Sequence, residues 1–155
     1  MPSLFDYPTG EGQPEQAEYF LRQGSDDDWA TLIKYTHSRR LRAGETVMSP
    51  GEDDRALYIV TDGTLEAVIP GRRGSFRQIS TFESGSVIGE LSFFDGRPRS
   101  ATVRALTDAE LARLSLESFD SLAASRPALA RLILFDLGRI LANRLRSAQL
   151  VSSTS

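Results

Sequence analysis

The sequence of 155 residues contains no cysteine and only one histidine, His37. Without cysteine there can be no disulfide, no thiolate metal site and no cysteine nucleophile, and this composition is typical of a reducing compartment. A single histidine cannot build the multi-histidine centre of a metalloenzyme. His37 follows "IKYT" at the end of a predicted helix, beside two arginines. This setting favours an exposed position at the helix end over a role in a catalytic triad.

Long apolar runs are also missing. No stretch approaches the ~20 apolar residues that cross a bilayer. The first residues, "MPSLFDYPTGEGQPEQ", lack the positive start and apolar core of a signal peptide. We therefore expect a cytoplasmic protein that makes no membrane contact. The net charge of −3 gives no general attraction for nucleic acid.

The charge is distributed unevenly along the chain. Residues 1–36 carry seven acidic and two basic side chains, whereas residues 126–149 carry five arginines and one aspartate. Such blocks indicate solvated faces, a contact between the two ends of the chain, or a partner.

Length and composition predict one globular domain, with 40% hydrophobic and 25% charged residues. We predict a flexible N-terminal arm at 1–14, which contains three prolines, a single domain at 15–150, and a polar tail at 151–155. A first helix is predicted within "EQAEYFLRQG", ending at Gly24. A second begins after Ser25, a helix cap followed by three aspartates where the helix dipole favours negative charge.

From Leu41 the pattern changes to short apolar runs, broken by glycine and proline every eight to twelve residues. This spacing is typical of an antiparallel sandwich or barrel. Helical spacing returns at 116–125 and again from Pro127, which suits the first turn of a helix. The fold class predicted is α+β, mainly β: an antiparallel β jelly-roll of about eight strands, flanked by N-terminal helices and two C-terminal helices. The last helix carries an apolar stripe made of Leu129, Leu132, Ile133, Ile140, Leu141, Leu145 and Ala148.

One segment, "GELSFFDGRPRSATV", combines groups that suit a nucleotide. Arg99 can offer two parallel donors to a phosphate. Glu90 beside that anion is unfavourable unless it accepts a hydrogen bond from the same ligand, and a sugar hydroxyl is a suitable donor. Ser100 adds a hydroxyl, and a short helical turn would offer the backbone amides of Gly89, Glu90, Leu91 and Ser92 to an anion. In the alternative interpretation, Glu90 and Arg99 simply pair with each other across the loop.

This segment resembles the phosphate-binding cassette of the cyclic nucleotide-binding domain. The upstream stretch "AGETVMSPGEDDRALYIVTDGTLEAVI" is similar to the first half of that family, and the C-terminal helices resemble its closing helices. The likeness spans residues 41–145. It implies a jelly-roll receptor in signal transduction that is not an enzyme, has no metal or resident cofactor, and binds cyclic AMP (cAMP) as first choice.

The resemblance also implies a role for each matching position. Glu90 would accept a hydrogen bond from the ribose 2′-hydroxyl, and Arg99 would pair with the cyclic phosphate. Leu91 stands where the family carries the cassette's movement to the terminal helices, and the closing helix would contact the base near Asn143 and Arg144. A hydroxyl at position 100 is compatible with cyclic GMP (cGMP) as well as cAMP. Backbone amides of Gly89, Leu91 and Ser100 would complete the pocket.

Two further expectations concern output. Regulators of this family append a helix-turn-helix after the long helix, whereas this sequence ends at Ser155. We therefore expect no direct DNA binding, and output through a protein partner or a homodimer formed along the C-terminal helix. Two other functions stay open: a ligand-free interaction domain with a relic pocket, and a cupin-like enzyme, which shares the jelly-roll but needs clustered histidines.

Overall fold

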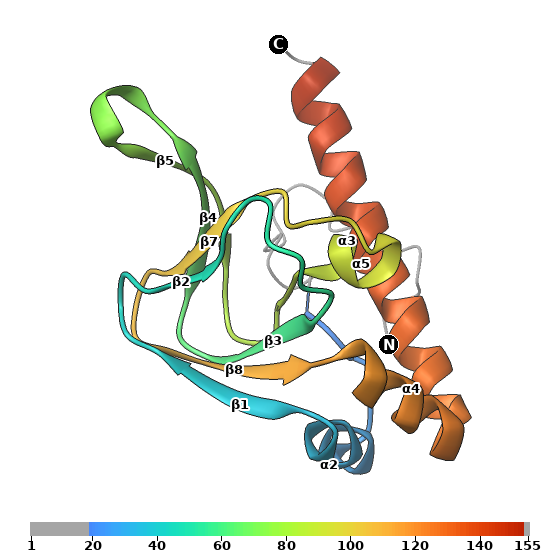
Figure 1. The fold of residues 1–155 in the computed structure, drawn as a ribbon. Helices are drawn as coiled ribbons and strands as arrows, with labels where there is room; N and C mark the ends of the chain where they lie inside the picture. The colour runs from blue at the N-terminus through green and yellow to red at the C-terminus, as the bar shows by residue number, and fades with distance from the viewer. Residues whose placement is uncertain (1–18, 154–155) are drawn as a thin grey trace.

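A computed structural model describes residues 19–153 of the chain (Figure 1). The helices are α2 (Asp26–Lys34), α3 (Glu90–Asp95), α4 (Leu116–Ser125) and α5 (Pro127–Ser153), with a 3-10 turn η1 (Arg72–Gly74). The strands are β1 (His37–Leu41), β2 (Thr46–Met48), β3 (Leu57–Asp62), β4 (Leu65–Pro70), β5 (Phe76–Phe82), β6 (Val87–Ile88), β7 (Thr102–Ala105) and β8 (Ala109–Leu114).

The strands form two four-stranded sheets, with the orders β1-β8-β3-β6 and β2-β7-β4-β5. Every pairing is antiparallel. Inward-facing side chains of both sheets, among them Tyr58, Leu65, Val103 and Leu111, form one apolar core. A second core lies between the first sheet and the helices, with Leu57, Leu114, Leu122 and Ile133 as members. This arrangement confirms the α+β jelly-roll prediction.

The helix predicted after Ser25 is confirmed as α2. The Ser25 hydroxyl accepts a hydrogen bond from the Asp28 amide at 3.1 Å, and the Asp28 carboxylate accepts one from the Ser25 amide at 3.0 Å. This capping box satisfies two amides that would otherwise lack partners.

The helix predicted at 15–24 is wrong for its described part, because residues 20–23 form a turn. Leu21 adopts a left-handed backbone with φ of 58°. Its amide donates to the carboxylate of Asp136 on α5, so tertiary contacts override the local preference for a helix. Residues 15–18, and the arm predicted at 1–14, lie outside the described residues.

The first strand also begins earlier than predicted, at His37 instead of Leu41. His37 pairs with Arg113 of β8, so it is the exposed first residue of an edge strand and not the end of a helix. The stretch "HSRRL" has no apolar alternation, and its strand conformation is imposed by β8.

The long helix α5 crosses the molecule and continues through Ser153, three residues into the predicted tail. It buries Leu129, Ala130, Ile133, Leu137 and Ile140. Leu145, which the predicted stripe included, is 61% exposed. Figure 1 shows the C-terminal half of α5 and the β4–β5 hairpin projecting past the barrel. Within residues 19–153, no helix combines the length and the hydropathy needed to span a membrane.

Candidate functional site

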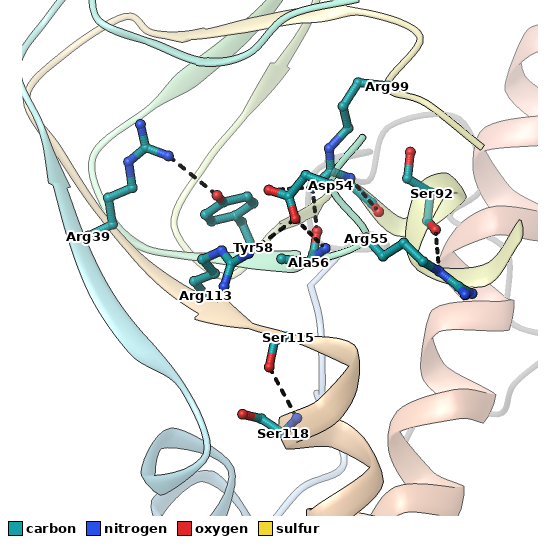
Figure 2. A network of polar contacts seen from close by, with 11 residues as sticks. Arg39, Asp54, Arg55, Ala56, Tyr58, Ser92, Arg99, Arg113, Ser115 and Ser118 are labelled. Atoms are coloured by element: carbon teal, nitrogen blue, oxygen red, sulfur yellow. Dashed lines mark hydrogen bonds and ion pairs between the residues drawn. The ribbon is translucent and has the colours of Figure 1, made fainter. Parts of the chain in front are cut away.

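The cassette segment starts where β6 ends, and Gly89 makes the turn into α3. Gly89 has φ of 84°. A Cβ at this position would lie 2.6 Å from an Arg99 guanidinium nitrogen and 2.9 Å from the Ala56 carbonyl oxygen. Both the backbone angle and the space therefore require glycine. The other end of α3 is held by Arg55, whose guanidinium donates to the Ser92 carbonyl at 3.3 Å (Figure 2). It also donates to the Phe93 carbonyl at 2.9 Å.

Arg99 is 4% exposed and is anchored mainly on backbone oxygens. Its Nη2 donates to the Ala56 carbonyl at 2.6 Å, and its Nη1 donates to the Gly89 carbonyl at 3.1 Å. Its own backbone amide donates to the Glu52 carbonyl at 2.8 Å. Its Nε is buried and has no hydrogen-bond partner among the described residues. Burying an N–H donor costs free energy unless the donor finds a hydrogen-bond acceptor.

Asp54 is the carboxylate nearest to this arginine, with Oδ2 lying 3.6 Å from Nη2 of Arg99. Its Oδ1 accepts hydrogen bonds from the Ala56 amide at 2.9 Å and from Arg113 at 3.1 Å. Partial burial by itself raises the pKa of Asp54, but the Ala56 hydrogen bond and the charges of Arg113 and Arg99 outweigh it and lower the pKa below its usual value. Asp54 is therefore an ionised counter-ion shared by two arginines, as Figure 2 shows.

Glu90 is 8% exposed and finds its partner on α5. Its Oε1 lies 2.7 Å from Nη1 of Arg144. Arg144 also donates to the Val87 carbonyl at 2.8 Å, and its guanidinium lies 5.3 Å from the centre of the Phe82 ring. Among the described residues Glu90 pairs with Arg144 and Arg99 with Asp54, so the alternative of a direct Glu90–Arg99 pair is wrong.

These side chains surround a pocket of about 150 Å³, which is called the cassette pocket below. Of the eight residues predicted for the site, it brings together Gly89, Glu90, Leu91, Ser92, Arg99, Ser100 and Arg144. Asn143 is not part of its lining. The apolar wall was not predicted: it consists of Met48, Ala67, Phe82, Ile88, Ala101 and Val103. Strand alternation could have indicated Ala67 and Val103 as inward-facing, but nothing local distinguishes a pocket wall from a core position.

The charge of the lining follows directly from these residues. It contains two arginines, Arg99 and Arg144, and one glutamate, Glu90, so its formal charge is +1. Behind the lining, the carboxylate of Asp54 is matched by Arg113. The pocket therefore combines an apolar wall, a single net positive charge and one buried carboxylate.

A family model described as the cyclic nucleotide-binding domain matches residues 38–126. The matched range holds both sheets except for His37, and it includes α4 and the cassette pocket apart from Arg144. The chain belongs to the cyclic nucleotide-binding domain family.

Relatives of this cyclic nucleotide-binding domain include enzymes and regulators. Lysophospholipase nte1 of Aspergillus terreus is 30% identical over 107 residues, which is 69% of this chain and 7% of that protein. The chain thus spans only a small part of the curated relatives that it matches.

Two solved structures show the same fold. The catabolite activator protein of Thermus thermophilus superposes with a TM-score of 0.74 at 26% identity, covering 92% of this chain and 62% of that one. The regulatory domain of protein kinase A from Toxoplasma gondii, co-crystallised with cAMP, gives a TM-score of 0.56 at 30% identity, covering 74% and 46% of the two chains.

Proposed function

We propose that this domain, residues 15–150, is a cytoplasmic sensory module that binds a cyclic nucleotide in the cassette pocket and passes the event on through α5. cAMP is the first candidate and cGMP the second. The observation that carries the proposal is Arg99: a buried guanidinium, fixed on two backbone carbonyls, with one donor lacking a partner beside a pocket. An anionic oxygen of the ligand would satisfy that donor.

In this proposal each group has a separate task. Arg99 holds the cyclic phosphate, and the amides of Gly89, Leu91, Ser92 and Ser100 surround it. Glu90 accepts the ribose 2′-hydroxyl, which gives a function to a carboxylate that otherwise repels the phosphate. The apolar wall covers the sugar and the base.

The charge of the lining favours a phosphodiester over a phosphomonoester. A cyclic phosphodiester carries one negative charge at neutral pH, whereas a phosphomonoester carries about −1.5 to −2. A lining of +1 neutralises the first and leaves the second with excess charge in a buried site. A cyclic nucleotide therefore fits better than the linear nucleotide of the same base.

Arg144 provides the connection to α5. The pocket of about 150 Å³ is smaller than the roughly 300 Å³ of common ligand sites. A nucleotide can enter only if part of the lining moves, and Arg144 is the lining residue that α5 contributes. When the ribose hydroxyl of the ligand donates to Glu90, Arg144 changes its partner and α5 shifts its position. The ligand thereby changes the populations of two states of the domain, which differ in the position of α5. The base contact predicted near Asn143 and Arg144 remains part of this proposal.

The output of this shift is proposed to be a homodimer. Leu134, Gly138, Leu141 and Leu145 follow at alternating intervals of four and three residues, the spacing of a two-helix seam. Leu134 is 40% and Leu145 is 61% exposed, so this leucine stripe is uncovered in the single chain. A second copy of α5 would bury it, and a different protein partner is the alternative. We propose no contact with DNA or membrane.

Thermal melts and calorimetric titrations of the purified chain test the proposal. cAMP or cGMP should raise the melting temperature, because a ligand that binds the native state stabilises it, and 5′-AMP should raise it less. Glu90→Gln should weaken binding of the cyclic nucleotide, whereas Arg97→Lys, at an exposed position of the same segment, should not. If neither cyclic nucleotide shifts the melt at millimolar concentration, the pocket is a relic and the chain an interaction domain. A stoichiometric transition metal in the purified protein would instead favour the cupin-like enzyme.

A further inference from the structure

A larger hollow lies elsewhere on the molecule, between the turn at 20–23 and the first half of α5. It has a volume of about 430 Å³ and shares no lining residue with the cassette pocket. Phe135, Leu132 and Ala128 supply its apolar side, and Arg131, Asp136 and Arg139 its charged side. We call it the α5 groove. Phe135 is 65% exposed, and with Leu132 and Ala128 it offers an apolar contact surface inside a groove.

The polypeptide itself enters at the edge of this groove. Arg139 donates to the Tyr19 carbonyl at 2.9 Å and pairs with Asp136 at 2.9 Å, and Asp136 accepts the Leu21 amide. Tyr19 and Leu21 are thereby fixed on α5. The segment 1–18, which precedes Tyr19, is therefore tethered next to the groove, and a short tether corresponds to a local concentration of about a millimolar or more.

The composition of that segment is complementary to the groove. Residues 1–18 contain four acidic side chains and neither lysine nor arginine, and they include Leu4, Phe5 and Tyr7. The groove offers two arginines against one aspartate, with Arg131 lying 5.2 Å from the centre of the Phe135 ring. The segment thus carries apolar and acidic groups that would complement the apolar and basic groups of the groove.

A second copy of α5 is a less suitable occupant. Ala128, Leu132, Phe135 and Arg139 recur every three or four residues along one side of α5. The leucine stripe lies on another side, because one residue advances a helix by about 100°. A dimer formed through the leucine stripe would leave the α5 groove uncovered.

We propose that the acidic segment 1–18 docks into the α5 groove of its own chain, with the apolar side chains around Phe5 against Phe135 and Leu132 and its carboxylates beside Arg131. The reach is sufficient: the 14 residues from Phe5 to Tyr19 extend to at most roughly 46 Å, whereas the groove from Ala128 to Arg139 is roughly 16 Å long. This docking does not depend on nucleotide binding. It gives the segment a structural role instead of that of a free arm.

The absence of cysteine makes a clean test possible, because one introduced cysteine carries a spin label at one place. Ser3→Cys is labelled with a nitroxide in the isotope-labelled chain of 155 residues, and amide signals are recorded with the label oxidised and then reduced. Docking predicts a strong loss of signal for amides at 128–139 and little loss for the strands. The loss should diminish at about 1 M salt, where the Debye length is about 3 Å.

Two variants and one mixture make the result decisive. Phe135→Ser and Arg131→Glu should each restore the amide signals of 128–139, whereas Leu145→Ser, on the leucine stripe, should not. Mixing labelled chains with isotope-labelled chains that carry no nitroxide, both with the Leu145→Glu substitution that should keep them monomeric, should leave the signals unchanged. Signal loss in the mixture would assign the groove to a second copy and overturn the proposal. A weak loss spread evenly over the surface, or a loss centred elsewhere, would overturn it as well.

Discussion

Replacing Arg99 by lysine is the sharpest test of the cassette pocket, because it keeps the charge and removes the geometry. The guanidinium donates to the Ala56 and Gly89 carbonyls with two nitrogens, and its Nε has no hydrogen-bond partner among the described residues. A lysine ammonium is a single point and cannot reach both carbonyls and a phosphate from the same place. Asp54, 3.6 Å from the arginine, remains near a positive charge in either case.

The size of the effect follows from the number of hydrogen bonds lost. Each hydrogen bond to a charged group contributes about 1.5–3 kcal/mol. Losing one bond to the phosphate should raise the Kd about 10- to 150-fold, and losing both bonds of a two-pronged contact should raise it about a hundredfold or more. Folding should also suffer, by about 1–3 kcal/mol, because a buried carbonyl loses its donor.

Isothermal titration with cAMP and cGMP measures the first effect, and urea unfolding measures the second. Arg97→Lys is the matched control, since Arg97 is exposed in the same loop. If Arg99→Lys binds the nucleotide like the parent while its stability falls, Arg99 is purely structural and does not hold the phosphate.

Three other substitutions examine separate parts of the molecule. Gly89→Ala should lower both stability and nucleotide affinity, because the added Cβ would lie 2.6 Å from Arg99; a melt and a titration that match the parent would contradict this. Glu66 is buried and accepts hydrogen bonds from Arg104 at 2.7 Å and from Gln78, which lower its pKa, so Glu66→Gln should cost about 1–2 kcal/mol at neutral pH. A carboxylate with a lowered pKa stabilises the fold above the ordinary carboxylate range, and this contribution is lost as the pH falls through the pKa of the folded state. The urea midpoints of the parent should therefore drop more steeply on acidification than those of Glu66→Gln. Parallel curves would contradict the assignment. Leu145→Glu should shift the mass measured by light scattering from dimer to monomer, whereas a monomeric parent would refute the proposed seam.

The cassette could be predicted because its information is local. Gly89, Glu90 and Arg99 lie within one short segment, so its resemblance to the phosphate-binding cassette is visible in the sequence, and the structure brings the three residues to one pocket. Their partners come from far along the chain: Asp54 precedes Arg99 by 45 residues, and Arg144 follows Glu90 by 54. Such pairings depend on how the sheets and α5 pack, and no spacing rule in a single sequence reveals them.

The errors in secondary structure have the same origin. Residues 20–23 have a helical composition, yet Asp136 and Arg139 hold the flanking backbone in a turn. The strand β1 has no apolar alternation, and it exists because β8 offers it a hydrogen-bonding edge. Where an element is stabilised by its own sequence, as α2 is by Ser25, the prediction is confirmed.

The anchoring of Arg99 on main-chain oxygens has a practical meaning for engineering. Every amino acid has a backbone carbonyl, so the hydrogen bond that orients the Arg99 guanidinium on residue 56 does not depend on the side chain at that position. Among the described residues the acidic partner of Arg99 is Asp54, whose Oδ2 lies farther away than these carbonyls, at 3.6 Å. Substituting Asp54 thus offers a way to adjust the charge beside the cassette pocket, and Asp54→Asn would keep an oxygen for the Ala56 amide that Asp54 now holds.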